Sequence, residues 1–207
     1  MNKFITIIAS LLIAFTFTKT VLADGHQVYG PYPITLKGYD GDATNSVKYT
    51  GQMARHALHD SLKALVKSGD VAKMMAYYNG EDGLAIVAPA SKGDFVIKQT
   101  MVSEIGSGNL SGKMYKGYIP GWGNLTGPEA LEHMITKAGE VEGGFDPNTG
   151  MDYTQLISKF AMGAVFYNQA VNSYLGSKME IGQKPNSEPY KEGAYYTGKE
   201  HSWDEAF

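Results

Sequence analysis

The sequence contains no cysteine. The chain therefore has no disulfide, no thiolate to bind a metal, and no cysteine that could carry a lipid behind an export signal. It also lacks the phosphate-binding loops of nucleotide-binding proteins, the G-x-S-x-G motif of serine hydrolases and the H-E-x-x-H motif of zinc peptidases. No enzyme class is therefore indicated by a motif of its own.

Basic residues are not in excess, since 18 Lys and Arg stand against 21 Asp and Glu. Proteins that bind nucleic acid usually carry a marked basic footprint. We therefore expect no nucleic-acid partner. Outside the first residues there is also no unbroken apolar run of about 20 residues, the length that a membrane-spanning helix needs, so we expect no transmembrane span after signal removal.

The N-terminus has the pattern of a secretory signal peptide. A basic start at Lys3 is followed by an apolar run over 4–17 and by the small-residue spacing Val21-Leu22-Ala23, which is typical of a cleavage site. An uncleaved anchor is the alternative. Cleavage after Ala23 leaves 207 less 23, or 184, residues. We expect a bacterial protein that is periplasmic or secreted.

The rest of the chain indicates an all-α fold. Residues 24–45 are rich in turn formers and predict an extended N-terminal arm, and residues 46–207 predict one helical-bundle domain with long glycine-rich loops. Apolar periodicity and capping residues predict helices at 51–67, 71–78, 94–105, 126–141, 152–176 and from 197 onward. For 94–105 the β-branched content leaves a strand open as the alternative.

The segment Asp152–Gly176 is predicted to be the central helix of this bundle. Asp152 is placed to cap it and Gly176 to end it in a left-handed conformation. Its apolar residues extend almost around the axis, which predicts that other elements surround it. Gly163 lies within it, where glycine costs about 1 kcal/mol relative to alanine, so we expect a neighbouring backbone to approach closely there.

The predicted terminal helix holds the main candidate for chemistry. At 100° per residue one face presents three carboxylates and an imidazole, which belong to Glu200, His201, Asp204 and Glu205. Such a face is what iron and manganese sites in helical bundles use, and zinc also accepts it. The alternative is a solvated acidic first turn in which Glu200 completes a capping box with Thr197.

His56 and Asp60 are a second, weaker candidate. They lie four residues apart on the helix predicted at 51–67, so their side chains can pair or share a metal ion. The alternative is an ordinary surface histidine beside an acidic neighbour.

Four blocks of the sequence carry a family resemblance: SVKYTGQMARHALHDSLKALVK, GNLSGKM, LISKFAMGAVFYNQAVNSYL and EHSWDEAF. Together they resemble a bacterial family of exported proteins and lipoproteins known only as a domain of unknown function, DUF4856. The resemblance implies an all-α, imelysin-like architecture. Imelysins are helical periplasmic proteins linked to iron handling and were once proposed to be metallopeptidases. Their G-x-H-x-x-E signature matches this chain at His201 with Asp204 in the acidic place, and Gly198 stands one residue earlier than the signature requires.

These observations predict a periplasmic binding protein for a metal such as iron, or for another small ligand, rather than an enzyme. A divalent metal, iron or zinc, would be held by His201 and Asp204 with help from Glu200 and Glu205. A metal-dependent hydrolase of the imelysin type is the first alternative, in which one acid acts as base toward a metal-bound water. A structural envelope or interaction module is the second. The sequence names no protein partner.

The terminal helix also predicts that the domain continues beyond Phe207. The capping box begins a helix at Thr197, but only ten residues follow it, fewer than the roughly 12 that a stable isolated helix needs. We therefore expect further bundle helices downstream.

Signal cleavage can be tested directly. We expect the exported protein to begin at Asp24, and intact-mass measurement on protein recovered from its native compartment checks this. A mass that still includes residues 1–23 would favour the uncleaved anchor.

Overall fold

The computed structural model describes residues 32–86, 99–105, 109–180, 182–183 and 185–207. The predicted signal peptide, the first residues of the predicted arm and the first five residues (94–98) of the helix predicted at 94–105 lie outside the described residues. Residues 32–45 contain turns but no helix or strand, in keeping with an extended arm. They belong to the same compact unit as the helices that follow.

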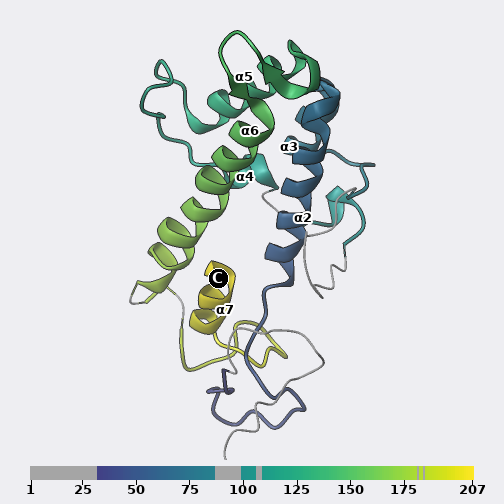
Figure 1. Cartoon of the computed structure of the whole chain (residues 1–207). Coiled ribbons are helices and arrows are strands. Elements are labelled where there is room, and N and C mark those ends of the chain that lie inside the picture. Colours follow the sequence, from purple (N-terminus) through teal and green to yellow (C-terminus); the bar gives the residue numbers. More distant parts are fainter. Residues whose placement is uncertain (1–31, 87–98, 106–108, 181, 184) are drawn as a thin grey trace, which may run out of the picture. The chain divides into compact units, whose positions relative to one another are not determined.

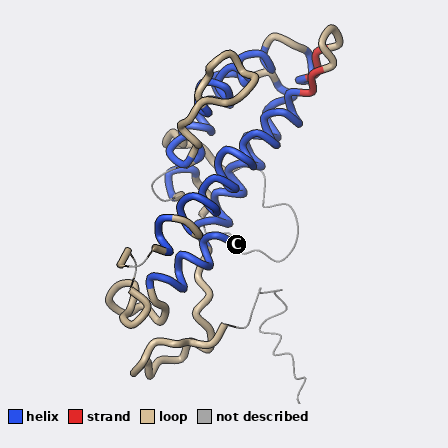
Figure 2. Tube along the Cα trace, turned by 90° about the vertical axis from the view of Figure 1, so that its left-hand side faces the viewer, coloured by secondary structure: helices blue, strands red, loops and turns tan. Residues whose placement is uncertain are grey.

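The described residues are mostly helical, as the sequence predicts (Figure 1). The α-helices are α2 (Thr50–Leu65), α3 (Val71–Asn79), α4 (Leu110–Lys113), α5 (Gly127–Gly139), α6 (Tyr153–Ala161) and α7 (Gly198–Ala206). Two π-helical segments, η4 (Met162–Tyr167) and η5 (Gln169–Tyr174), continue α6 without a break. Short 3-10 turns lie at Val66–Ser68, Val102–Glu104, Glu142–Gly144 and Ser177–Met179. One antiparallel hairpin, β1 (Phe145–Asp146) and β2 (Met151–Asp152), precedes α6 and pairs Phe145 with Asp152 (Figure 2).

The predicted helix starts are confirmed where a side chain caps them. Asp70 accepts a hydrogen bond from the backbone N–H of Lys73 at 2.9 Å, and Asp152 accepts one from Gln155 at 3.2 Å. Each cap satisfies a backbone donor that the first helical turn leaves free. Local sequence therefore determines where these helices begin.

The core is built around α2 rather than around the long helix. Leu58 and Leu62 of α2 and Val66 directly after it are fully buried, and they belong to one apolar cluster with Leu131 and Ile135 of α5. α3 and α6 complete this cluster, since both contact α2 and α5. The core therefore centres on the helix predicted at 51–67 and not on the segment 152–176 that was predicted to be central.

The prediction that the long helix is surrounded on most sides is wrong. Met162, Tyr167 and Val171 are 46%, 68% and 41% exposed. The backbone explains the difference, because η4 and η5 make i→i+5 hydrogen bonds and hold more residues in each turn than an α-helix. Each residue then advances by less than the 100° of an α-helix, and Tyr167 and Val171 turn toward solvent whereas Tyr174 is buried.

Two further predictions on the long helix are also wrong. Apart from the helix's own backbone, no atom of the described residues lies within 4 Å of the place where a Cβ on Gly163 would stand, so none of the other described segments approaches it with its backbone. Gly176 has φ −89° and ψ −112°, which is not the left-handed conformation of a helix-ending glycine.

The described part of the predicted helix 94–105 is extended and then makes a 3-10 turn. Met101 forms an antiparallel bridge with Ala85, and Ile86 donates its N–H to the carbonyl of Thr100 at 2.9 Å. The β-branched residues noted there accordingly favour the strand alternative over 99–101.

Among the described residues, none of the helices is both long enough and apolar enough to cross a bilayer.

Gly163→Ala is expected to stabilise the protein by up to about 1 kcal/mol, because an exposed glycine inside a helix loses more backbone entropy on folding than alanine and here has no neighbour to clash with. Chemical denaturation of the two proteins measures the difference. Gly144→Ala is the matched contrast, since Gly144 has φ 77° and packs against Val66, and it should destabilise. A loss of stability in Gly163→Ala would show that this position does meet a backbone.

Candidate functional site

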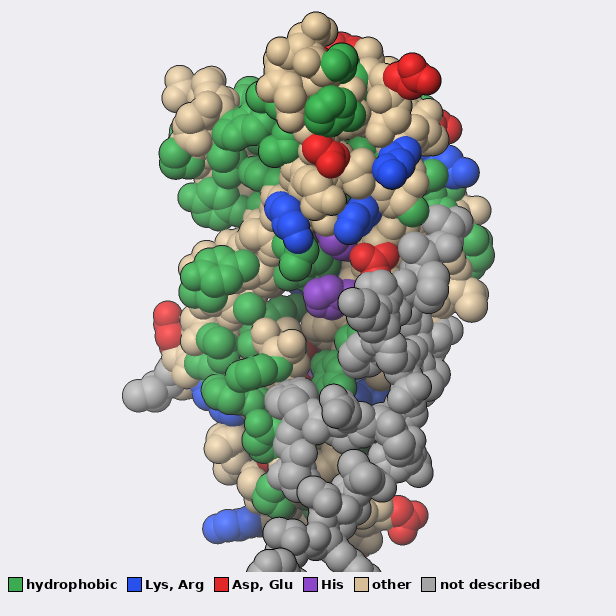
Figure 3. Space-filling view, viewed as in Figure 1, with side chains coloured by type: hydrophobic (Ala, Val, Ile, Leu, Met, Phe, Trp, Pro, Cys, Tyr) green, Lys and Arg blue, Asp and Glu red, His purple; other side chains and the backbone are tan. Residues whose placement is uncertain are grey.

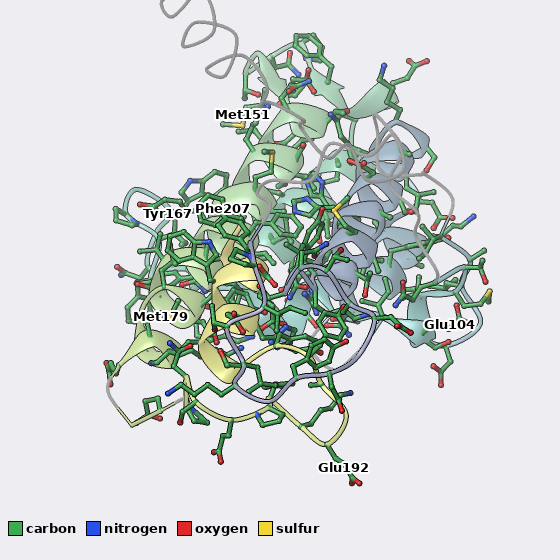
Figure 4. The ribbon with its side chains drawn as sticks, turned by 90° about the horizontal axis from the view of Figure 1, so that it is seen from below. Glu104, Met151, Tyr167, Met179, Glu192 and Phe207 are labelled. Carbon is green, nitrogen blue, oxygen red and sulfur yellow. The ribbon has the colours of Figure 1, made fainter. Side chains whose placement is uncertain are left out.

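The candidate site lies where α7 packs against the start of α2 and against η5. α7 contacts η5 directly, and Figures 1 and 4 both show it beside the second half of the long helix. We call this place the α7 junction. The α7 junction joins the segment that leads into α2 to the last helix, because Lys48 donates its backbone N–H to Asp204 Oδ2 at 2.8 Å.

The α7 helix turns its polar face inward. Asp204 is only 2% exposed, whereas Trp203 and Phe207 are 39% and 73% exposed. The sequence predicts that the three carboxylates and the imidazole share one face of this helix. The sequence does not tell which face of α7 packs against the rest of the domain. Only the structure shows that the charged face is the buried one.

Glu200 has the local structural role of the alternative given above, in which it completes a capping box with Thr197. Thr197 donates its N–H to Glu200 Oε2 at 2.7 Å, and Glu200 donates its own N–H to Thr197 Oγ1 at 3.2 Å. This is the predicted capping box. The arm adds a further contact, because Thr35 Oγ1 donates to Glu200 Oε1 at 2.9 Å.

Glu205 is the acceptor at the centre of the α7 junction. Gln52 of α2 donates to its Oε1 at 2.9 Å, and the ammonium of Lys178 lies 3.3 Å from its Oε2. His201 Nε2 stands 3.6 Å from Oε1. The Glu205 side chain is 17% exposed, so these contacts are only partly screened by water.

Three cations interact electrostatically with this one carboxylate, and one of them, Lys178, contacts it. Lys178 pairs with Glu205 and also lies over the ring of Tyr174, with 4.1 Å between its Nζ and the ring centroid. Burial lowers the pKa of Arg55, and Tyr174 and Glu205 partly offset that effect. Burial also lowers the pKa of Lys113, which the positive charges of Arg55 and Lys178 lower further. Three cations therefore act on Glu205, while the other two carboxylates of the α7 junction are engaged by backbone N–H groups, Asp204 by Lys48 and Glu200 by Thr197.

His201 is enclosed by aromatic rings. The ring centroids of Tyr190 and Tyr196 lie 4.5 Å and 5.1 Å from that of the imidazole. Burial lowers the pKa of His201 from its ordinary 6.5, although Glu205 and the Lys48 backbone act in the opposite direction. Its Nδ1 is buried and makes no hydrogen bond of normal geometry with the described residues. The imidazole is therefore neutral near pH 7.

The predicted pair of His56 with Asp60 does not form. Asp60 Oδ1 lies 3.5 Å from Nδ1 of His59 instead, and Nε2 of His59 lies 3.1 Å from the carbonyl oxygen of Ser158. Because a carbonyl only accepts, Nε2 carries the proton. His56 stacks on Phe166 with ring centroids 4.1 Å apart. Both histidines thus help to join α2 to the long helix, and burial lowers the pKa of His56.

The predicted metal ligands are close together, but their oxygens are already engaged. Glu200 caps α7, Asp204 accepts from Lys48, and Glu205 accepts from Gln52 and Lys178. Within the described ranges no group of three or more His, Cys, Asp and Glu side chains is arranged to hold a metal ion. Arg55, Lys113 and Lys178 would also repel a cation. This donor set suits iron or zinc poorly, and metal binding stays a prediction.

The sequence does not single out the residues that α2, α4, the long helix and the 3-10 turn after it bring to the site: Gln52, Arg55, Lys113, Tyr174 and Lys178. One signal was available. Arg55 is the only arginine in a chain with 17 lysines, and arginine is the cation that proteins prefer for buried ion pairs. Arg55 lies on a stripe of α2 that is otherwise apolar, and this position could have marked it as a candidate site residue.

A family model described as a domain of unknown function, DUF4856, matches residues 130–207. The match covers most of α5, the long helix and α7, and it confirms the predicted family resemblance for this part of the chain. No curated protein and no solved structure matches the chain. The imelysin-like relationship stays a prediction.

The low pKa of His201 predicts a pH dependence of stability. The unfolded chain binds a proton near pH 6.5 whereas the folded chain resists it, so the stability contributed by neutral His201 is complete above pH 6.5 and is lost as the pH falls below that value. We expect the unfolding free energy of the wild type to fall more steeply between pH 7 and pH 5 than that of His201→Gln. His133→Gln, which changes an exposed histidine, should keep the wild-type slope. Equal slopes in the wild type and His201→Gln would contradict the burial of this imidazole.

Proposed function

We propose that this chain is a ligand-binding protein of the bacterial envelope and that the α7 junction binds a small anionic ligand. The single observation that carries the proposal is the charge of the site, where Arg55, Lys113 and Lys178 act on one carboxylate, Glu205. Export rests on the signal-peptide pattern of residues 1–23 alone.

Lys113 supports the anionic character of the ligand. It is half-buried, and no ion pair joins its ammonium to a carboxylate of the described residues. Burying an ammonium without a counter-ion costs free energy, and the neighbouring Arg55 and Lys178 add repulsion. An anion bound between these groups would remove both costs, so the site gains more from an added negative charge than from an added metal ion.

The neutral groups at the α7 junction also suit the binding of a small ligand. Gln52 donates at 3.3 Å to the hydroxyl of Tyr174, and Tyr190 and Tyr196 flank His201. Side chains of this kind provide the few oriented polar contacts that fix a small ligand in a site. At the α7 junction none of the described groups is placed as a nucleophile beside a base, and we therefore propose binding as the function of this site.

The test compares anions with metals on the same protein. Thermal unfolding is followed with added inorganic phosphate and succinate, and separately with Fe²⁺ and Zn²⁺, at constant ionic strength. We expect the anions to raise Tm in the wild type, because a ligand that binds only the folded state stabilises it. Lys113→Met should abolish that increase. Lys137→Met is the matched control, since Lys137 forms an exposed surface pair with Glu140, and it should respond like the wild type.

The metal hypothesis makes the opposite prediction on the same variants. Stoichiometric metal binding that is lost in His201→Ala and in Glu205→Gln would support the metal site and contradict an anionic ligand. A Tm that none of the anions changes, or that rises equally in Lys113→Met, would also contradict the proposal.

A further inference from the structure

A second feature lies on the outer side of the long helix, away from the residues that line the α7 junction. Two neighbouring cavities of about 400 Å³ and about 480 Å³ share Lys159 and Phe160 in their walls. We call them together the α6 groove. Each cavity is within the usual size range of ligand pockets, about 300–1,000 Å³. Figure 3 shows hydrophobic side chains gathered along the left-hand side of its view, over the long helix and the loop before α5.

The walls of the α6 groove are mainly apolar and come from two parts of the chain. The glycine-rich loop before α5 supplies Ile119 and Trp122, and the long helix supplies Leu156, Phe160 and Tyr167. The backbone joins these parts, because Tyr115 donates its N–H to the carbonyl of Ala164 in η4 at 2.7 Å. This contact holds the loop beside the helix and keeps both sides of the groove in place.

Gly163 leaves space open in the larger cavity. It lines this cavity, and in the described part of the chain no atom beyond the helix's own backbone lies within 4 Å of the place where its Cβ would stand. Neither a close backbone nor a left-handed conformation explains a glycine here, although it weakens the helix relative to alanine. The groove therefore has room at Gly163 that a side chain would fill.

One charged side chain, that of Lys159, lies in this apolar surface. Of the residues that line the two cavities, only Lys159 carries a charge, and it lies at the wall that they share. No ion pair joins Lys159 to a carboxylate of the described residues. The complement to such a groove is an apolar group that bears a single negative charge.

We propose that the α6 groove binds an apolar carboxylate, with its hydrocarbon part in the cavity over Gly163 and its carboxylate against Lys159. Burial of the hydrocarbon against Phe160 and Tyr167 supplies the driving force, and the ion pair selects acids over neutral molecules of the same shape. The α6 groove and the α7 junction are separate sites, so this proposal does not depend on the proposed function.

Trp122 provides a direct signal for binding. It lines the smaller cavity, and the chain has only 2 tryptophans. In a Trp203→Phe background, Trp122 is therefore the only tryptophan, and the tryptophan fluorescence comes from it alone. Decanoate is the probe, and 1-decanol is the matched probe without the charge. We expect saturable changes in Trp122 fluorescence with decanoate below about 1 mM, which corresponds to at least moderate affinity.

Three variants in this background locate the binding. Gly163→Leu should weaken decanoate binding at least tenfold by filling the cavity, and circular dichroism confirms that the variant is folded. Should leucine prevent folding, Gly163→Ala gives the same test with a smaller loss. Lys159→Gln should weaken decanoate about fivefold, the usual effect of one exposed ion pair, and should leave decanol unchanged. Lys73→Gln on α3 is the control for loss of an exposed lysine and should have no effect.

Several results would overturn the proposal. These are the absence of saturable binding up to 1 mM, equal affinity for decanoate and decanol, or binding that neither Gly163→Leu nor Lys159→Gln weakens. Loss of decanoate binding in Lys113→Met would place the ligand at the α7 junction instead and would also contradict the proposal.

Discussion

The arrangement of this protein depends on the hydrogen bond between the backbone of Lys48 and the carboxylate of Asp204. The two residues are 156 positions apart, and the contact joins the segment that leads into α2 to the last helix. Asp204 is almost fully buried, and a buried carboxylate is tolerated only when it has partners. This requirement holds α7 with its polar face inward and brings Glu205 and His201 against α2.

The inward polar face has a direct electrostatic consequence. Glu205 must accept from Gln52 and Lys178 because it cannot reach bulk water freely. The negative charge of Glu205 also partly offsets the lowering of the pKa values of Arg55 and Lys113 that burial causes. A conventional amphipathic helix would have buried Trp203 and left the acids in solvent, and no charged site would exist. The polarity of the α7 junction is therefore the result of how α7 packs.

The π-helical segments determine which residues of the long helix face solvent on the side away from the core. Wider turns rotate Tyr167 and Val171 outward, while Ala164 and Val165 face the core. The same rotation brings the carbonyl of Ala164 to the N–H of Tyr115, so that the glycine-rich loop lies along the helix. One helix thus separates a charged junction from an apolar groove, and the two surfaces suit different chemistry.

The sequence by itself determined the features that depend on neighbouring residues. Helix starts at Asp70, Thr126, Asp152 and Thr197 follow from caps that reach only three residues along the chain, and the shared face of His201 and Glu205 follows from helical spacing alone. Only the tertiary structure decided the rest. Which face of α7 is buried, which histidine meets Asp60, and where Arg55 lies depend on contacts between residues far apart in the chain. The turn from α to π geometry along the long helix likewise depends on contacts that no local pattern encodes.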